Sequence, residues 1–303
     1  MSLARIDQQH LACPNHARGD PVIEQQAARC HDHGDRYRVA MLGDDLAGQE
    51  PQPDHAHRAA VGDLLEPKRA RLLADIGTRH VNIIHATGVE GAARARGTVV
   101  VIDVLRSFTV SAYALAGGAR ECRLVRTVQE ARALADATPG SVISAEEGAL
   151  PVEGIPISNS PTAISAIDFA DRVLIQRSTA GTQVAAAVQE SEDIFAASLV
   201  VARATAQACL LRDPETLTLV ASADHPEDHA CAAYIESLVS GRRADVEALL
   251  EPLRASERYA RAISGEWPGF PPTDLELSLA ADRFEFAMPV SRSEGYLRLI
   301  ASF

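Results

Sequence analysis

Four short polar stretches of the chain carry side chains able to bind an anion or a metal ion. In the first, Asp103 directly follows a run of β-branched residues, and Arg106 and Ser107 come just after it. A carboxylate in this position can ligate a metal or activate a nucleophile. An arginine can bind an anion that also contacts free N–H groups at the start of the next helix. This pattern indicates chemistry on a phosphate or a carboxylate, and an ordinary helix cap is the alternative for Asp103.

The second and third stretches also follow predicted strands. The second contains the adjacent carboxylates Glu146 and Glu147, which suit a hard cation such as Mg2+ or, alternatively, a solvated turn. The third, residues 178–182, combines three hydroxyl side chains with a glycine before a predicted helix. This composition predicts a phosphate-binding turn, in which hydroxyls, backbone N–H groups and the helix dipole act on one anion. Arg177 would add positive charge, and a simple helix start is the alternative.

The fourth stretch, residues 222–229, gathers carboxylates and two histidines after another strand. A zinc site would use His225 and His229, but Pro226 lies between them, so one helix cannot carry both in the usual way. We therefore expect a helix N-terminus here, with Glu227 and Asp228 facing the positive end of the dipole or binding a metal. The two histidines are expected on the surface.

The elements that must position these stretches alternate between strands and helices. The expected strands are 81–86, 99–103, 121–125, 142–145, 172–176, 193–196, 217–221 and 284–287. The expected helices are 107–116, 128–137, 181–188, 199–211, 227–238, 245–256, 256–263 and 274–281. This alternation predicts a three-layer α/β/α fold with a mostly parallel or mixed sheet. The four polar stretches then meet in one crevice at the C-terminal ends of the strands.

The first 79 residues have a different composition. Seven of the ten histidines lie at or before His80, and only residues 64–76 have a helical pattern. A metal-binding tract at residues 30–33 is one interpretation. We favour a largely disordered extension over residues 1–79, since such a polar segment cannot bury enough apolar surface to fold. Residues 80–303 then form one α/β domain. A further hypothesis is that translation starts near Val81.

Composition excludes several classes of function. The chain of 303 residues has a formal net charge of -12 and no basic block, which argues against nucleic-acid binding. Lys68 is the single lysine, so no lysine acts from the body of the chain. Five scattered cysteines indicate reduced thiols in a cytoplasmic protein. No segment has the length of a membrane helix or the layout of a signal peptide.

Taken together, the motifs resemble those of the 2-phosphosulfolactate phosphatase family, Mg2+-dependent phosphatases of sulfonate and coenzyme M metabolism. Residues 103–109 are similar to its Asp-Val-Leu-Arg-Ala-Ser-Thr stretch, and residues 178–182 to its Thr-Thr-Asn-Gly-Thr turn. The resemblance covers residues 81–290 and also includes Glu146, Glu153-Gly154, Asn159-Ser160-Pro161, Glu227-Asp228, Cys231-Ala232, Asp282 and Pro289. Glu147, Ala149, Ala180 and Pro226 depart from the family pattern.

The resemblance implies a Mg2+-dependent phosphomonoesterase acting on 2-phosphosulfolactate or a similar small phosphorylated acid. The residues expected to act are Asp103, Arg106 and Asp228 in catalysis, Ser107, Asn159, Arg177, Ser178, Thr179, Gly181 and Thr182 in phosphate or substrate binding, and Asp103, Glu146, Glu227 and Asp228 at the metal. Asp103 could serve as nucleophile, base or metal ligand. The alternative function is a non-catalytic sensor of a small phosphorylated metabolite. The oligomeric state stays open, with a homo-oligomer as one alternative.

Overall fold

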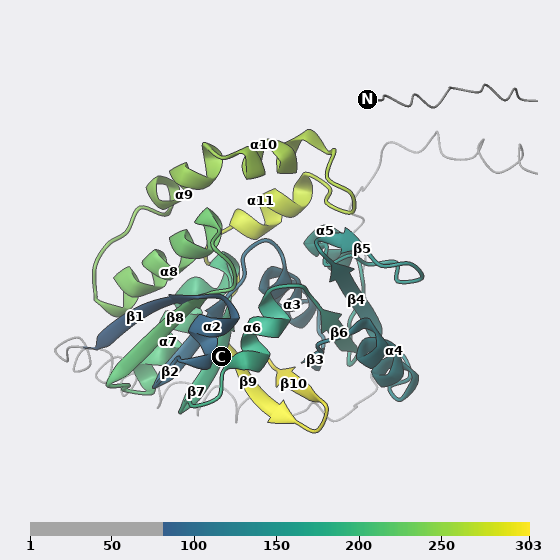
Figure 1. Cartoon of the computed structure of the whole chain (residues 1–303), viewed down its shortest axis with the longest axis horizontal. Coiled ribbons are helices and arrows are strands. Elements are labelled where there is room, and N and C mark those ends of the chain that lie inside the picture. Colours follow the sequence, from purple (N-terminus) through teal and green to yellow (C-terminus); the bar gives the residue numbers. More distant parts are fainter. Residues whose placement is uncertain (1–80) are drawn as a thin grey trace, which may run out of the picture. The chain divides into compact units, whose positions relative to one another are not determined.

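A ten-stranded sheet organises residues 81–303, the part of the chain that this computed structural model describes. The strand order is β1-β8-β2-β7-β9-β10-β3-β6-β4-β5 (Figure 1). The strands are β1 (Asn82–Thr87), β2 (Thr98–Ile102), β3 (Glu121–Leu124), β4 (Val142–Glu147), β5 (Leu150–Pro151), β6 (Val173–Arg177), β7 (Asp193–Ala197), β8 (Thr216–Ala221), β9 (Met288–Ser293) and β10 (Tyr296–Leu299). The helices are α2 (Gly88–Ala93), α3 (Ser107–Ala116), α4 (Val128–Asp136), α5 (Pro161–Ser165), α6 (Gly181–Ala187), the 3-10 turn η1 (Leu199–Val201), α7 (Ala202–Leu211), α8 (Pro226–Val239), α9 (Val246–Arg254), α10 (Glu257–Ser264) and α11 (Thr273–Leu279).

The sheet contains two parallel groups joined by an antiparallel hairpin. One group is β1, β8, β2 and β7, and the other is β3, β6 and β4. The hairpin of β9 and β10 lies between them, with β9 antiparallel to β7 and β10 antiparallel to β3. The sheet is therefore mixed.

Helices cover both faces of the sheet, which gives the expected three layers. Val99 and Val101 of β2 belong to the apolar cluster that includes residues of α3 and α6, while Val100 and Ile102 belong to the cluster under α7 and α8. This alternation explains why β2 is buried at every position: a central parallel strand is covered on both faces. On the second parallel group, Val173 and Ile175 pack against Ala131 of α4.

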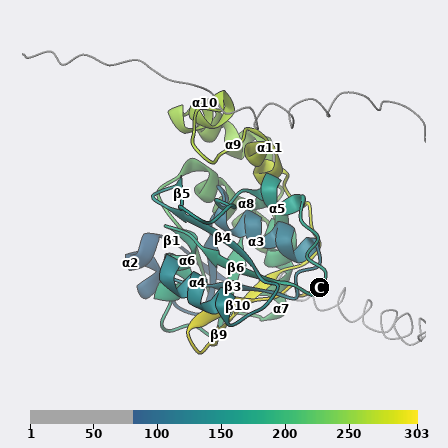
Figure 2. The ribbon, with the colours of Figure 1, turned by 90° about the vertical axis from the view of Figure 1, so that its right-hand side faces the viewer.

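Two helices connect the parallel groups and bring their strand ends together. α3 contacts β7 as well as β3 and β6, and α6 contacts β2 and α3. α3 starts directly after β2, and α6 starts directly after β6. The polar turns that follow β2 and β6 therefore meet at the N-terminal ends of two neighbouring helices. In both views, α9, α10 and α11 lie together on one side of the strands (Figures 1 and 2).

The predicted fold class is confirmed, and local signals account for many element bounds. A capping box begins α4, since Thr127 Oγ1 accepts from Glu130 N at 3.1 Å while Glu130 accepts from Thr127 N at 3.0 Å. The strand expected at 284–287 is wrong. Phe284 and Phe286 alternate as in a strand, but their rings stack on each other at 5.6 Å, and regular pairing begins only at Met288. Strands β5, β9 and β10 and helices α2 and α5 were not expected.

Several expectations concern residues outside the described range. These are the disordered extension over residues 1–79, the metal tract at 30–33, the helix at 64–76 and the translation start near Val81. They stay predictions. Among residues 81–303, no helix combines the length and apolar character needed to cross a membrane.

Candidate functional site

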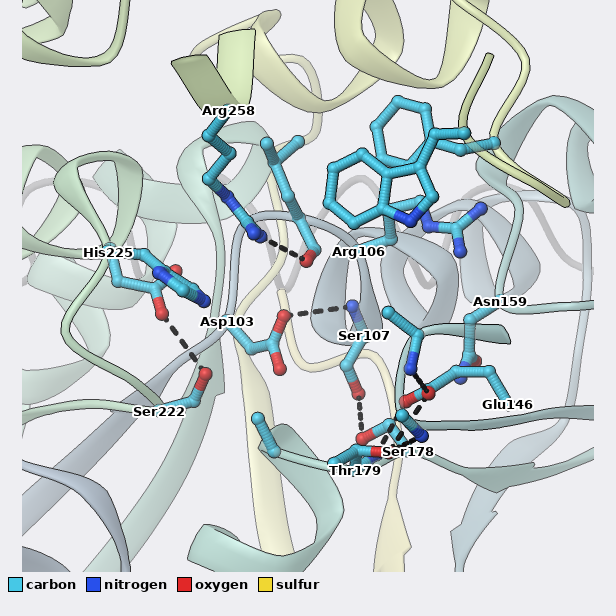
Figure 3. A pocket seen from close by; sticks show the side chains of 17 residues that line it. Asp103, Arg106, Ser107, Glu146, Asn159, Ser178, Thr179, Ser222, His225 and Arg258 are labelled. Carbon is cyan, nitrogen blue, oxygen red and sulfur yellow. Dashed lines mark hydrogen bonds between the residues drawn. The ribbon is translucent and has the colours of Figure 1, made fainter. Parts of the chain in front are cut away.

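All four polar stretches contribute to one pocket of about 170 Å³ (Figure 3). It opens where β2, β4, β6 and β8 end, and residues from α10 and the loop before α11 line its other side. The lining residues are Asp103, Leu105, Arg106, Ser107, Glu146, Gly148, Ala149, Asn159, Ser178, Thr179, Ala180, Ser222, His225, Asp228, Arg258, Trp267 and Phe270. The expected crevice at the strand ends is therefore present.

Asp103 lies at the base of this pocket, one residue beyond β2. Its Oδ1 accepts the backbone N–H of Ser107 at 3.0 Å, so it does cap α3 as the alternative interpretation supposed. Burial raises the pKa of Asp103 to about 6, although the hydrogen bonds from Ser107, Ser222 and Gly181 act in the opposite direction. The carboxylate of Glu146 adds to the increase. Asp103 is thus a buried acid that faces a polar pocket.

Asp228 is the second buried carboxylate of the pocket and belongs to the first turn of α8. Its Oδ1 accepts from Val104 N at 2.8 Å, and its Oδ2 accepts from Ser222 Oγ at 3.0 Å. The pKa of Asp228 is raised well above its usual value, first by burial and then by the charges of Asp103 and Glu227. The ionised carboxylates of Asp103 and Asp228 therefore repel each other in a site from which water is largely excluded.

Glu146 lies at the end of β4 and holds the neighbouring turns together. Its Oε1 accepts from Thr179 N at 2.5 Å, and its Oε2 accepts from Ala149 N at 2.6 Å and from Thr179 Oγ1 at 2.9 Å. Both carboxylate oxygens are already hydrogen-bonded to the protein. Its expected role at a metal stays a prediction, while its contacts with both turns are part of the structure.

The hydroxyl-rich turn after β6 is stabilised by its own hydrogen bonds. Ser178 N donates to Thr182 Oγ1, and Thr182 N donates to Ser178 Oγ, both at 3.0 Å. Ser178 Oγ also donates to Ser107 Oγ at 3.0 Å, which links this turn to the start of α3. Three of the backbone N–H groups expected to bind phosphate, those of Ser178, Thr179 and Thr182, thus have partners within the protein. Ser178, Thr179 and Ala180 line the pocket, whereas Gly181 and Thr182 do not.

Arg106 faces the pocket but is held by a buried acid. Its Nη1 donates to Asp274 Oδ2 at 2.8 Å and to the carbonyl of Gly269 at 2.5 Å. Its guanidinium lies 4.6 Å from the ring centre of Phe270. Asp274 also accepts from Ser160 Oγ at 2.7 Å. Arg106 therefore anchors the segment around α11 to the strand ends, and its expected role in catalysis stays a prediction.

Arg258 of α10 lies in a similar setting in the same pocket. Its Nε donates to Glu227 Oε1 at 2.6 Å, and its guanidinium is 5.3 Å from the ring centre of Trp267. Glu227 is fully buried, and its Oε2 has no partner among the described residues. Glu227 does not line the pocket, whereas Arg258 does.

The remaining predicted residues are Asn159 and Arg177. Asn159 lines the pocket, yet its amide nitrogen donates to the carbonyl of Arg177 at 2.8 Å and its Oδ1 accepts from Ser144 and Gln176. Arg177 does not line the pocket, and its Nη1 donates to the carbonyl of Glu146. Both residues fix the backbone at the ends of β4 and β6, and their binding roles stay predictions.

Sequence reasoning missed one wall of the pocket. Arg258, Trp267 and Phe270 come from the segment after the last parallel strand, so the rule about strand ends could not find them. The single tryptophan of the chain, followed by Pro268 and Gly269, was the available signal.

His225 was expected on the surface but lines the pocket, and burial together with the charge of Arg258 lowers its pKa. His229 is exposed and pairs with Asp224 at 2.7 Å. Within residues 81–303, no group of three or more His, Cys, Asp and Glu side chains is arranged to hold a metal.

Comparison with known proteins identifies the family. The model of the 2-phosphosulfolactate phosphatase family matches residues 85–264. The chain belongs to the 2-phosphosulfolactate phosphatase family, and so to the phosphoric monoester hydrolases. A probable 2-phosphosulfolactate phosphatase of Bacillus subtilis (strain 168) is 33% identical over 199 residues, covering 64% of this chain and 86% of the relative. One from Synechococcus sp. (strain RCC307) is 31% identical, covering 65% of this chain and 81% of the relative.

The departures from the motifs of the 2-phosphosulfolactate phosphatase family lie in different places. Glu147 points out of the pocket, with its side chain 58% exposed and 3.7 Å from Arg177. Ala149 has a φ of 64°, a conformation that glycine adopts more easily. Ala149 and Ala180 do line the pocket. Of these three departures, only the two alanines therefore line the pocket.

Proposed function

We propose that this chain is a Mg2+-dependent phosphatase that hydrolyses 2-phosphosulfolactate to sulfolactate and phosphate. The observation that carries the proposal is the convergence of two buried carboxylates, Asp103 and Asp228, with the hydroxyls of Ser107 and Ser178 in a single pocket. Membership of the family points to the same substrate.

The carboxylates of the pocket fit Mg2+. Asp103 and Asp228 are desolvated, their pKa values are raised, and the charge of Asp103 contributes to the shift of Asp228. A cation next to both would relieve this repulsion. Mg2+ typically takes one or two carboxylates together with waters and substrate phosphate oxygens. When bound there, it would neutralise and polarise the phosphoryl group.

The protein's own groups bind and orient the phosphoryl group. Because Ser178 Oγ donates to Ser107 Oγ, the proton of the Ser107 hydroxyl is free to donate to a phosphoryl oxygen. The hydrogen bonds from Ser107 N and Ser222 Oγ hold Asp103 and Asp228 in fixed positions. Fixed donors and charges of this kind stabilise the charge that spreads over the phosphoryl oxygens in the transition state.

The overall reaction is a hydrolysis. The oxygen of a water molecule bonds to phosphorus, and the bond from phosphorus to the ester oxygen breaks. The electron pair leaves with that oxygen, which takes up a proton to become the hydroxyl of sulfolactate.

The test is phosphate release from 2-phosphosulfolactate by protein stripped of metal with a chelator, with and without added Mg2+. We expect turnover only with Mg2+, and a loss of roughly 10²- to 10³-fold or more in kcat for Asp103→Asn. Asp136→Asn is the matched control, because Asp136 is an exposed residue at the end of α4. Binding without turnover of any phosphoester by folded protein would indicate the sensor instead.

A further inference from the structure

The pocket separates its charges onto two sides. The carboxylates of Asp103 and Asp228 lie at the strand ends, where β2 and β8 finish. The guanidinium groups of Arg106 and Arg258 lie on the side formed with α10 and the loop before α11 (Figure 3). If the phosphoryl group binds with a cation beside the carboxylates, then a second acidic group on the same substrate can bind beside the arginines.

The two arginines differ in exposure and in the guanidinium nitrogen that is ion-paired. The side chain of Arg106 is 4% exposed, and its Nη1 is engaged by Asp274 and the carbonyl of Gly269. The side chain of Arg258 is 21% exposed and uses Nε for Glu227. Its Nη2 makes only a long contact of 3.4 Å with the carbonyl of Leu105, and its Nη1 has no partner among residues 81–303. Arg258 is therefore the more exposed of the two guanidinium groups, and Nη1 and Nη2 are the donors that it presents to the pocket.

The guanidinium of Arg258 is also held in place before any ligand arrives. Glu227 fixes its Nε edge, and Trp267 packs against its face. Trp267 in turn stacks on Phe270 at 4.9 Å with an interplanar angle of 11°. In Figure 3, Arg258 reaches from α10 toward Asp103. The end formed by Nη1 and Nη2 matches two oxygens of a carboxylate or a sulfonate, and holding it in advance lowers the entropic cost of binding.

We propose that Arg258 binds the acidic group of the substrate that does not react, and so makes the enzyme specific for phosphorylated acids over neutral phosphoesters. The proposal rests on the phosphatase function given above. The shared chemistry is that of a sulfonate or a carboxylate oxyanion, and 2-phosphosulfolactate carries both. Arg258 is thus a specificity residue rather than a catalytic one.

The test compares three substrates with wild-type protein and two variants, Arg258→Gln and Arg258→Lys. The substrates are 2-phosphosulfolactate, 2-phospholactate, which lacks the sulfonate, and phenyl phosphate, which has no second acid. For Arg258→Gln we expect the ratio of kcat/KM for 2-phosphosulfolactate to that for phenyl phosphate to fall about 10- to 100-fold, the value of hydrogen bonds to a charged group. Arg258→Lys keeps a charge beside Glu227 and is expected to lower the ratio less. The lysine variant also keeps the test possible if Arg258→Gln does not fold.

Arg261 provides a matched control. Its guanidinium also lies over Trp267, at 4.8 Å, but it does not line the pocket. Arg261→Gln is therefore expected to leave the substrate ratio within about twofold of wild type. A larger loss for 2-phosphosulfolactate than for 2-phospholactate in Arg258→Gln assigns the sulfonate to Arg258. Equal losses for these two, relative to phenyl phosphate, assign the carboxylate.

Calorimetric titration with sulfolactate separates failure of this inference from failure of the proposed function. Hydrolysis with an unchanged substrate ratio in both Arg258 variants overturns the inference and leaves the phosphatase in place. Sulfolactate binding that depends on Arg258, in a protein that hydrolyses none of the three esters, overturns the phosphatase and supports the oxyanion site. If the protein shows no hydrolysis and no sulfolactate binding that depends on Arg258, both the phosphatase function and the role of Arg258 are overturned.

Discussion

Gly181 and Asp103 approach so closely that a Cβ atom at residue 181 would lie 2.7 Å from Asp103 Oδ2. The same atom would lie 2.8 Å from Ser107 Oγ. The start of α6 is thus packed directly against the pocket side chains that follow β2. Only a residue without a side chain permits this contact.

Gly181→Ala is therefore expected to lower activity while α6 remains formed, since alanine favours helices. The added methyl group must displace Asp103 or Ser107, and a shift of about 1 Å in a catalytic group can cost roughly 10²-fold in rate. The measurement is kcat for phosphate release together with far-UV circular dichroism. Gly117→Ala, at the far end of α3, is the control. Full activity of Gly181→Ala would show that the contact is not needed.

Asp103→Asn is expected to stabilise the metal-free protein. Burial raises the pKa of Asp103 from 3.8 to about 6, so the folded state binds its proton more tightly than the unfolded state. The stability contributed by that proton is present below about pH 4 and lost as pH rises through about 6. The variant should thus gain about 1 to 3 kcal/mol over wild type at pH 7.5 and almost nothing at pH 4. Denaturant melts at both pH values check this, and an equal gain at both would contradict it.

The acidic limb of the activity profile should depend on metal concentration. Protons and Mg2+ compete for Asp103 and Asp228, whose pKa values are raised by burial. At limiting Mg2+, activity is expected to fall as pH decreases through about 6, and saturating Mg2+ should move this fall to lower pH. Rates measured from pH 5 to 8 at two Mg2+ concentrations decide the point. If the fall in activity at low pH does not move with the Mg2+ concentration, the group that titrates is neither Asp103 nor Asp228.

Asp274→Asn is expected to destabilise the protein strongly. It leaves the buried guanidinium of Arg106 without its counter-charge, and breaking a buried pair from one side costs about 3 to 5 kcal/mol. Glu251→Gln is the control, since Glu251 pairs with Arg254 on the surface at 3.2 Å. Urea denaturation of both variants measures the difference. Equal midpoints would mean that Arg106 finds another partner.

Much of this architecture could be predicted because local patterns and packing agree. The β-branched run of β2 is buried on both faces, and the polar residues after it can only lie at the strand end. The strand-end rule therefore located Asp103, Ser107, Ser178 and Asp228, all of which line one pocket.

The rest depended on contacts between distant parts of the chain. Arg258 and Trp267 reach the pocket from a helix and a loop that no periodic pattern ties to the strand ends. The pairing of Arg106 with Asp274 spans 168 positions of sequence. The internal bonding of the 178–182 turn also could not be foreseen, because hydroxyl side chains bind backbone N–H groups as readily as they bind phosphate.

The most direct test of the account is a crystal structure of the protein with sulfolactate, phosphate and Mn2+, whose anomalous signal marks the position that Mg2+ would occupy. We predict a cation in contact with the carboxylates of Asp103 and Asp228, and phosphate within hydrogen-bond distance of Ser107 and Ser178. A cation bound away from both carboxylates, or phosphate bound outside this pocket, would contradict the account.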